Sequence, residues 1–88
     1  MEIYVPEYST KKGFPFVWED EFAIKCEIDA YGGVCIHANR DGLISLARHL
    51  LVLAQENAPE YTHFHLDGFN ALEYPSVELT IVKREFPL

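Results

Sequence analysis

The chain has 88 residues, 49% of them hydrophobic, and its 14 acidic residues against 7 lysines and arginines give a formal charge of −7. This length supports one small domain, residues 1–88, and the mixture of apolar residues with both charge signs excludes a disordered chain. The negative charge argues against nucleic-acid binding and favours a basic partner, although it also suits simple solubility.

The sequence pattern argues against two further classes of protein. No run approaches the ~20 apolar residues that span a bilayer, and the first residues, "MEIYVPEYST", lack the pattern of a signal peptide. We therefore expect a cytoplasmic protein without a membrane segment. Cys26 and Cys35 are too few for a disulfide framework and lack the spacing of a zinc motif, so we expect both thiols to stay reduced.

The first third of the chain predicts a hairpin behind an irregular start. Residues 1–18 mix aromatic residues with prolines, and we expect a short strand at residues 3–5 and a turn at residues 11–13. Apolar and polar residues then alternate over residues 22–28 and again over residues 34–38, which is the pattern of two half-buried strands.

The apolar faces of these two strands predict how they pair. A three-residue loop at residues 31–33 would pair Ile28 with Ile36 and Cys26 with Ala38, so that both apolar sets share one face. This loop would place Gly33 in the left-handed conformation and Glu27 opposite His37 on the outer face. The two cysteines would then point to opposite faces.

A helix is expected over residues 41–57, begun by a cap at Asn39 or Asp41 and ended before Pro59. Apolar residues at helical spacing form a stripe that we expect to cover the sheet. Val52 lies opposite this stripe. It is either an isolated exposed valine, part of a partner surface, or covered by a second layer formed by the N-terminal segment. The stripe consists of Leu43, Leu46, Ala47, Leu50, Leu53 and Ala54.

Two more strands are expected at residues 61–67 and 77–83, separated by a long loop. The order is then ββαββ, an α+β domain with one amphipathic helix packed on one face of a mostly antiparallel sheet. The expected core joins Leu46, Leu50 and Leu53 of the helix to Phe22, Ile24, Ile28, Ile36, Phe64, Leu66, Leu79 and Ile81 of the strands.

The stretch "THFHLD" places His63, His65 and Asp67 on one strand face, because side chains alternate along a strand. With His37 or Glu78 from another strand, these residues could form a zinc site. An exposed sheet face lacks the surrounding shell that holds metal ligands in place, so we expect solvent-accessible, metal-free histidines. A metal-binding protein or metal-dependent enzyme using His37, His63, His65 and Glu78 is the alternative.

No set of residues predicts catalysis or a bound cofactor. Cys35 and His37 share a strand face but point in parallel, and Ser45 and His49 are close only as neighbours on a solvated helix surface. We therefore expect a protein that is not an enzyme.

The helix "GLISLARHLLVLAQ" and the later "THFHLDGFNALEYPSVELTIVK" resemble the small immunity proteins of bacterial polymorphic-toxin systems over residues 42–83. The resemblance implies a non-enzyme that binds and blocks a toxin made by the same cell line, often a nuclease with a basic cleft. It is carried by Gly42, Leu43, Leu46, Ala47, Leu50, Leu53 and Ala54 in the helix, and by His65, Asp67, Asn70, Leu72, Glu78, Leu79 and Ile81 in the second hairpin.

The expected toxin-binding surface is the outer sheet face together with the loop at residues 68–76, because the helix covers the other face. Aromatic residues would anchor a basic partner and carboxylates would orient it. A third interpretation is a structural subunit that forms a homodimer through a sheet edge or through the Val52 side of the helix. The expected partner-binding residues are Glu27, His37, His65, Asp67, Phe69, Tyr74 and Glu78.

Overall fold

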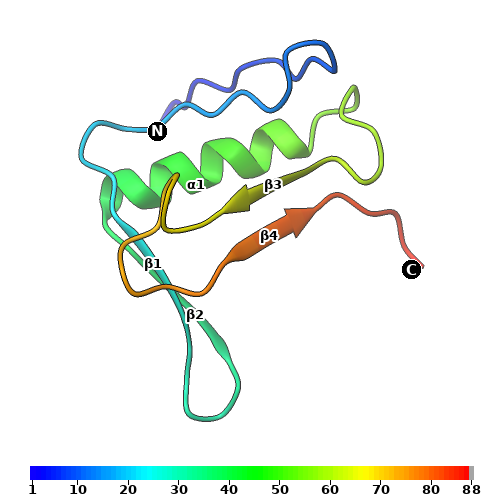
Figure 1. Cartoon of the computed structure of the whole chain (residues 1–88). Coiled ribbons are helices and arrows are strands. Elements are labelled where there is room, and N and C mark those ends of the chain that lie inside the picture. Colours follow the sequence, from blue (N-terminus) through cyan, green and yellow to red (C-terminus); the bar gives the residue numbers. More distant parts are fainter. Residues whose placement is uncertain (88) are drawn as a thin grey trace.

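The computed structural model describes residues 1–87 and contains one helix and four strands in the predicted order (Figure 1). The α+β class is confirmed, with one antiparallel hairpin before the helix and another after it. The helix ends four residues earlier than the residue 57 that the sequence predicted. The elements are β1 Ile24–Ile28, β2 Val34–Ala38, α1 Arg40–Leu53, β3 His63–Leu66 and β4 Leu79–Val82.

The predicted register of the β1–β2 hairpin is wrong by two residues. Ile28 pairs with Val34 and Cys26 pairs with Ile36. The loop does contain three residues, but they are residues 30–32, because Asp29 donates its N–H to the Gly33 carbonyl at 2.8 Å. The positive φ of 85° belongs to Gly32, the last loop residue, and not to Gly33.

The side chain of Asp29 explains this register. Its Oδ1 atom accepts hydrogen bonds from the N–H groups of Tyr31, at 2.8 Å, and Gly33, at 2.9 Å. An aspartate that bonds to the backbone two residues ahead initiates a turn at its own position. Because the shift is an even number of residues, each side chain keeps its predicted face, and Cys26 and Cys35 are free thiols on opposite faces.

The second hairpin pairs β3 with β4 and is connected to β1 by the loop that precedes β4. His65 lies opposite Thr80, and Phe64 lies opposite Ile81. In the loop, Glu73 donates its N–H to the Ile24 carbonyl at 2.8 Å, and Val77 donates to the Cys26 carbonyl at 2.9 Å. The molecule therefore has two two-stranded sheets joined through the free edge of β1, rather than one continuous sheet.

The core lies between the two hairpins and α1. Leu46 packs against it and Leu53 is buried in it, as predicted. Three expected core residues, Ile28, Ile36 and Leu50, are instead exposed. The exposure of Leu50 corrects the predicted orientation of the helix, and Ile28 and Ile36 lie on a part of the first hairpin that the core does not reach. The buried cluster consists of Ile24, Cys26, Leu53, Phe64, Leu66 and Leu72.

The helix is capped by Asn39, one of the two caps that the sequence prediction left open. The Oδ1 atom of Asn39 accepts a 2.7 Å hydrogen bond from the N–H of Gly42, and also bonds to the N–H of Ala23 at 3.0 Å. The rotation of the helix about its axis was not predicted. Its buried side carries Gly42, Ser45, Arg48, His49, Val52 and Leu53.

The N-terminal segment, residues 1–22, covers that polar side of α1 and forms a second layer (Figure 1). Val52 is fully buried, so of the three interpretations considered for it the second layer is confirmed. The strand expected at residues 3–5 is absent, while the turn at residues 11–13 is confirmed by hydrogen bonds from Lys12 and Gly13 to the Ser9 carbonyl. None of the helices formed by residues 1–87 is long and apolar enough to cross a membrane.

Candidate functional site

Two groups of charged and polar residues lie on the hairpins. The first is on the second hairpin, where His65 contacts Thr80, Asp67 and Glu78. Its Nδ1 atom lies 2.8 Å from the hydroxyl of Thr80, the residue directly opposite on β4. Its Nε2 atom lies 3.1 Å from a carboxylate oxygen of Glu78 and 3.4 Å from one of Asp67. The imidazole is therefore held between two carboxylates, in a position where its protonated form makes two ion pairs.

The four-residue metal site considered from the sequence is not assembled. His63 turns its Nδ1 atom to the Tyr61 carbonyl at 3.2 Å, and His37 lies on the other hairpin. Among the described residues, one group of three can offer ligand atoms within 4.8 Å of one another, namely His65, Asp67 and Glu78. One imidazole and two carboxylates suit a divalent cation, but the Nε2 atom of His65 lies within 3.4 Å of both carboxylates, so the three residues also form a polar group without an ion.

A second charged group lies on the β1–β2 hairpin. His37 places its Nε2 atom 2.8 Å from a carboxylate oxygen of Glu27, although Glu27 lies opposite Cys35 in the register. Lys25 adds a 3.7 Å contact to the other oxygen of Glu27. At the hairpin tip, hydrogen bonds from Gly33 and Tyr31 lower the pKa of Asp29, so this exposed carboxyl stays charged.

The loop between β3 and β4 contains Asp67 and Glu78 of the first group, and its backbone bonds to β1, the strand that carries Glu27 of the second group. Asp67 accepts hydrogen bonds from the N–H groups of Phe69, at 2.8 Å, and Asn70, at 3.0 Å. Asn70 returns a bond from its Nδ2 atom to the His65 carbonyl at 2.8 Å. This exchange holds the loop in shape while the rings of Phe69 and Tyr74 are almost fully exposed. The sequence analysis named Asn70 only as part of the family resemblance and gave it no role in this turn, although its spacing of three from Asp67 is a recognisable turn signal.

The two residue pairs considered for catalysis are not joined. Ser45 and His49 are buried rather than solvated, and each accepts a hydrogen bond from the N-terminal segment. Cys35 contacts Asp29 at 3.8 Å, while His37 contacts Glu27. In the part of the chain that the structure describes, the two members of each pair therefore contact other residues rather than each other.

The fold and this surface define a small α+β domain that presents charged and aromatic side chains to solvent. The family model of immunity protein 32 matches residues 34–85, which is more than half of the chain. The chain belongs to the immunity protein 32 family. The match contains β2, α1, β3, β4 and the loop with Phe69 and Tyr74, and it begins after β1. The comparisons with curated proteins and with solved structures find no match.

Proposed function

We propose that this chain is an immunity protein that binds a cognate bacterial toxin in the cytoplasm and neutralises it without catalysing a reaction. The toxin-binding surface in this proposal consists of the two charged groups and the loop at residues 68–76. Membership of the immunity protein 32 family supports a toxin partner. The residues that would contact the toxin are Glu27, His37, His65, Asp67, Phe69, Tyr74 and Glu78.

The observation that carries the proposal is the exposed pair of rings, Phe69 and Tyr74, beside exposed carboxylates. Solvent-exposed aromatic side chains are unfavourable in water, and in interfaces they supply most of the buried anchoring area. The neighbouring carboxylates of Glu27 and Glu78 would orient a basic partner. This combination is typical of a binding surface.

The charge of the chain supports a basic toxin domain. A formal charge of −7 produces a field that speeds the approach of a positively charged partner. Nucleases carry positive substrate clefts because they bind phosphate backbones. A nuclease domain whose cleft is covered by this acidic surface is therefore the partner that we propose.

The test measures binding and protection with matched charge reversals. Candidate toxin domains encoded beside the gene for this chain are purified, and their affinity for the chain is measured together with protection of cells that express the toxin. The double variant Glu27→Lys, Glu78→Lys should bind weakly and lose protection. The double variant Glu2→Lys, Glu56→Lys makes the same change of net charge at two exposed positions outside this surface and should retain both. Equal behaviour of the two variants would move the binding surface elsewhere.

A metal-binding protein is the second candidate, favoured by the arrangement of His65, Asp67 and Glu78. Zinc that stays bound after dialysis, and is lost in His65→Ala but not in His63→Ala, would support it. The toxin-binding proposal instead expects both variants and the wild type to hold no stoichiometric metal.

A further inference from the structure

The side of α1 that faces away from the core is apolar from Leu43 to the end of the helix. Its three leucines, Leu43, Leu50 and Leu51, are 56%, 41% and 46% exposed. Ala47 and Ala54 lie between them and are also exposed. No charged residue interrupts this face from Leu43 to Ala54. A surface helix normally has the opposite arrangement, with leucines inside and polar residues outside.

The spacing of this face is that of a helix-pairing seam. Leu43, Ala47, Leu50 and Ala54 follow one another at intervals of four, three and four residues. This is the heptad repeat in which the core positions of two supercoiled helices alternate. Leucine and alanine also alternate along this seam, so that each large side chain is followed by a small one. The occupant that fits such a seam is another helix.

We propose that α1 pairs with α1 of a second copy of this chain, antiparallel, about a two-fold axis. Placing that axis between Ala47 and Leu50 sets Ala47 opposite Leu50 of the second copy, and sets Leu43 opposite Ala54. Every leucine on the seam then faces an alanine, in both directions. Such a self-complementary patch is what a two-fold dimer requires.

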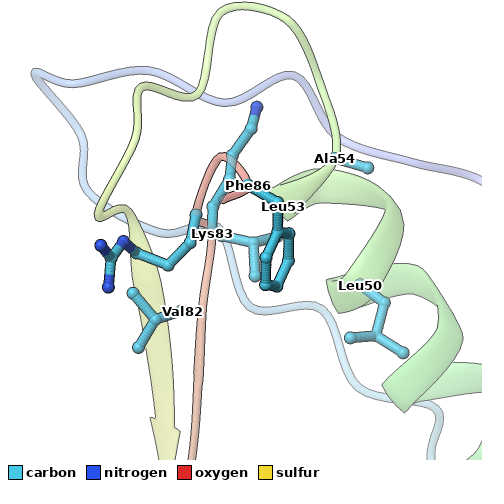
Figure 2. Close-up of a pocket in the computed structure, with 7 residues that line it drawn as sticks. Leu50, Leu53, Ala54, Val82, Lys83 and Phe86 are labelled. Atoms are coloured by element: carbon cyan, nitrogen blue, oxygen red, sulfur yellow. The ribbon is translucent and has the colours of Figure 1, made fainter. Parts of the chain in front are cut away.

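A groove beside the seam can receive the outermost leucine. It has a volume of about 450 Å³ and lies between α1 and the end of the chain after β4. Figure 2 shows Leu50 and Ala54 on one side of it, Val82 on the other, and Phe86 between them. Because Leu43 of the second copy lies opposite Ala54, its side chain would enter this groove. Phe86, which is largely exposed in the single chain, would be covered as well.

The area and charge of the chain set two conditions on the dimer. A standard interface buries about 800 Å² per partner, roughly an eighth of the 6251 Å² surface of this chain, so the seam must be supplemented by Val82 and Phe86. Each copy carries a charge of −7, so the copies repel one another at low ionic strength. The dimer should therefore tighten as salt is added, whereas steered toxin binding should weaken.

Sedimentation equilibrium from micromolar to millimolar concentration tests the proposal without any toxin. Wild type should dimerise, and Leu50→Glu should raise the dimer Kd by about 100-fold or more, because it places an unpaired charge in the seam. Tyr31→Glu introduces the same charge at an exposed ring on the hairpin tip and should leave the Kd unchanged. Circular dichroism establishes that each variant is folded, and Ala47→Lys, also at an exposed position, provides a second disruption of the seam.

The antiparallel register is tested by mixing the two disrupted variants. Ala47→Lys and Leu50→Glu should each be monomeric alone and should form a heterodimer together, since the introduced lysine faces the introduced glutamate. A monomeric wild type at every concentration would overturn the dimer. Loss of dimer in Tyr31→Glu as large as in Leu50→Glu would overturn the seam, and failure of the mixture to associate would overturn the register. None of these outcomes bears on toxin binding by the outer surface.

Discussion

The backbone N–H of Val17 donates a 3.0 Å hydrogen bond to the Nε2 atom of His49 and so joins the N-terminal segment to the buried side of α1. Since Nε2 accepts, the neutral ring carries its proton on Nδ1, which is buried without a partner among residues 1–87. Burial, together with the positive charge of Arg48, lowers the pKa of His49 to about 4. Protonation would break the bond to Val17 and add a buried charge beside Arg48.

The unfolding free energy should therefore fall as the pH falls from about 6.5 to about 4. The ordinary histidine pKa of 6.5 applies to the unfolded chain and the value of about 4 to the folded chain, so the unfolded state takes up the proton first. The contribution of His49 is complete above pH 6.5 and is lost progressively below it, by about 3 kcal/mol in all. Urea unfolding at a series of pH values measures this loss. His49→Gln should flatten the dependence and His63→Gln, an exposed control, should not. Equal slopes in wild type and His49→Gln would contradict the assignment.

Arg48→Met should lower the unfolding free energy by roughly 1–3 kcal/mol, because it leaves two part-buried backbone acceptors without their donor. The guanidinium donates to the Tyr4 carbonyl at 2.8 Å and to the Val17 carbonyl at 3.0 Å. Glu19, its ion-pair partner at 3.1 Å, is partly exposed, and Glu19→Gln should cost less than about 1 kcal/mol. Urea denaturation of both variants checks the difference. Similar losses would mean that the ion pair, rather than the carbonyls, is what Arg48 stabilises.

Gly42→Ala should destabilise the chain although alanine favours helices by about 1 kcal/mol over glycine. An added Cβ would lie 2.5 Å from the Ala23 carbonyl oxygen, a backbone atom that cannot move aside without shifting the start of β1. We expect a net loss of roughly 1–3 kcal/mol from this overpacking. Gly68→Ala, where a Cβ would meet nothing within 4 Å, is the control in a thermal-unfolding measurement. A more stable Gly42→Ala variant would show that the contact relaxes freely.

The kinetics of toxin binding should separate the charged residues from the rings. Glu78→Lys should slow association and reduce its salt dependence, because an exposed carboxylate acts on the approach of the toxin. Tyr74→Ala should mainly speed dissociation, since it removes buried contact area. Asp67 requires a milder change, Asp67→Asn, because its oxygen supports the turn through Phe69 and Asn70. Surface plasmon resonance at several salt concentrations distinguishes the two effects; faster dissociation alone in Glu78→Lys would reassign its role.

The sequence predicted the elements of this fold well, because their signals are local. Alternation identified both hairpins, and the Asn39 cap marked the start of the helix. The register of the first hairpin was missed because Gly32 and Gly33 both fit a left-handed loop position. The hydrogen bonds of the Asp29 side chain decide between them, and these depend on geometry that the apolar pattern does not contain.

The orientation of the helix was missed for a different reason. Pattern analysis assumes that a helix buries its most apolar face, and the leucine stripe was therefore assigned to the core. In the structure Ser45, Arg48 and His49 are buried because the backbone of the N-terminal segment satisfies their polar atoms. That segment has no regular periodicity, so its contribution could not be predicted. For the proposed toxin-binding surface, the sequence placed His65 and Asp67 on one strand face but did not determine the distances that bring both of them together with Glu78.

The region that matches the family is smaller than the part of the chain that folds together, because the N-terminal segment lies outside the match. The family match begins at residue 34, yet three side chains inside it, Ser45, Arg48 and His49, bond to backbone groups between residues 4 and 19. A fragment cut at the limits of the match would expose this guanidinium and this imidazole to water in place of those backbone groups. We expect a relative with polar residues at the same three positions to cover them with a segment of its own, whatever the sequence of that segment. Where a relative lacks one, the corresponding helix face should be apolar or should be covered by another protein.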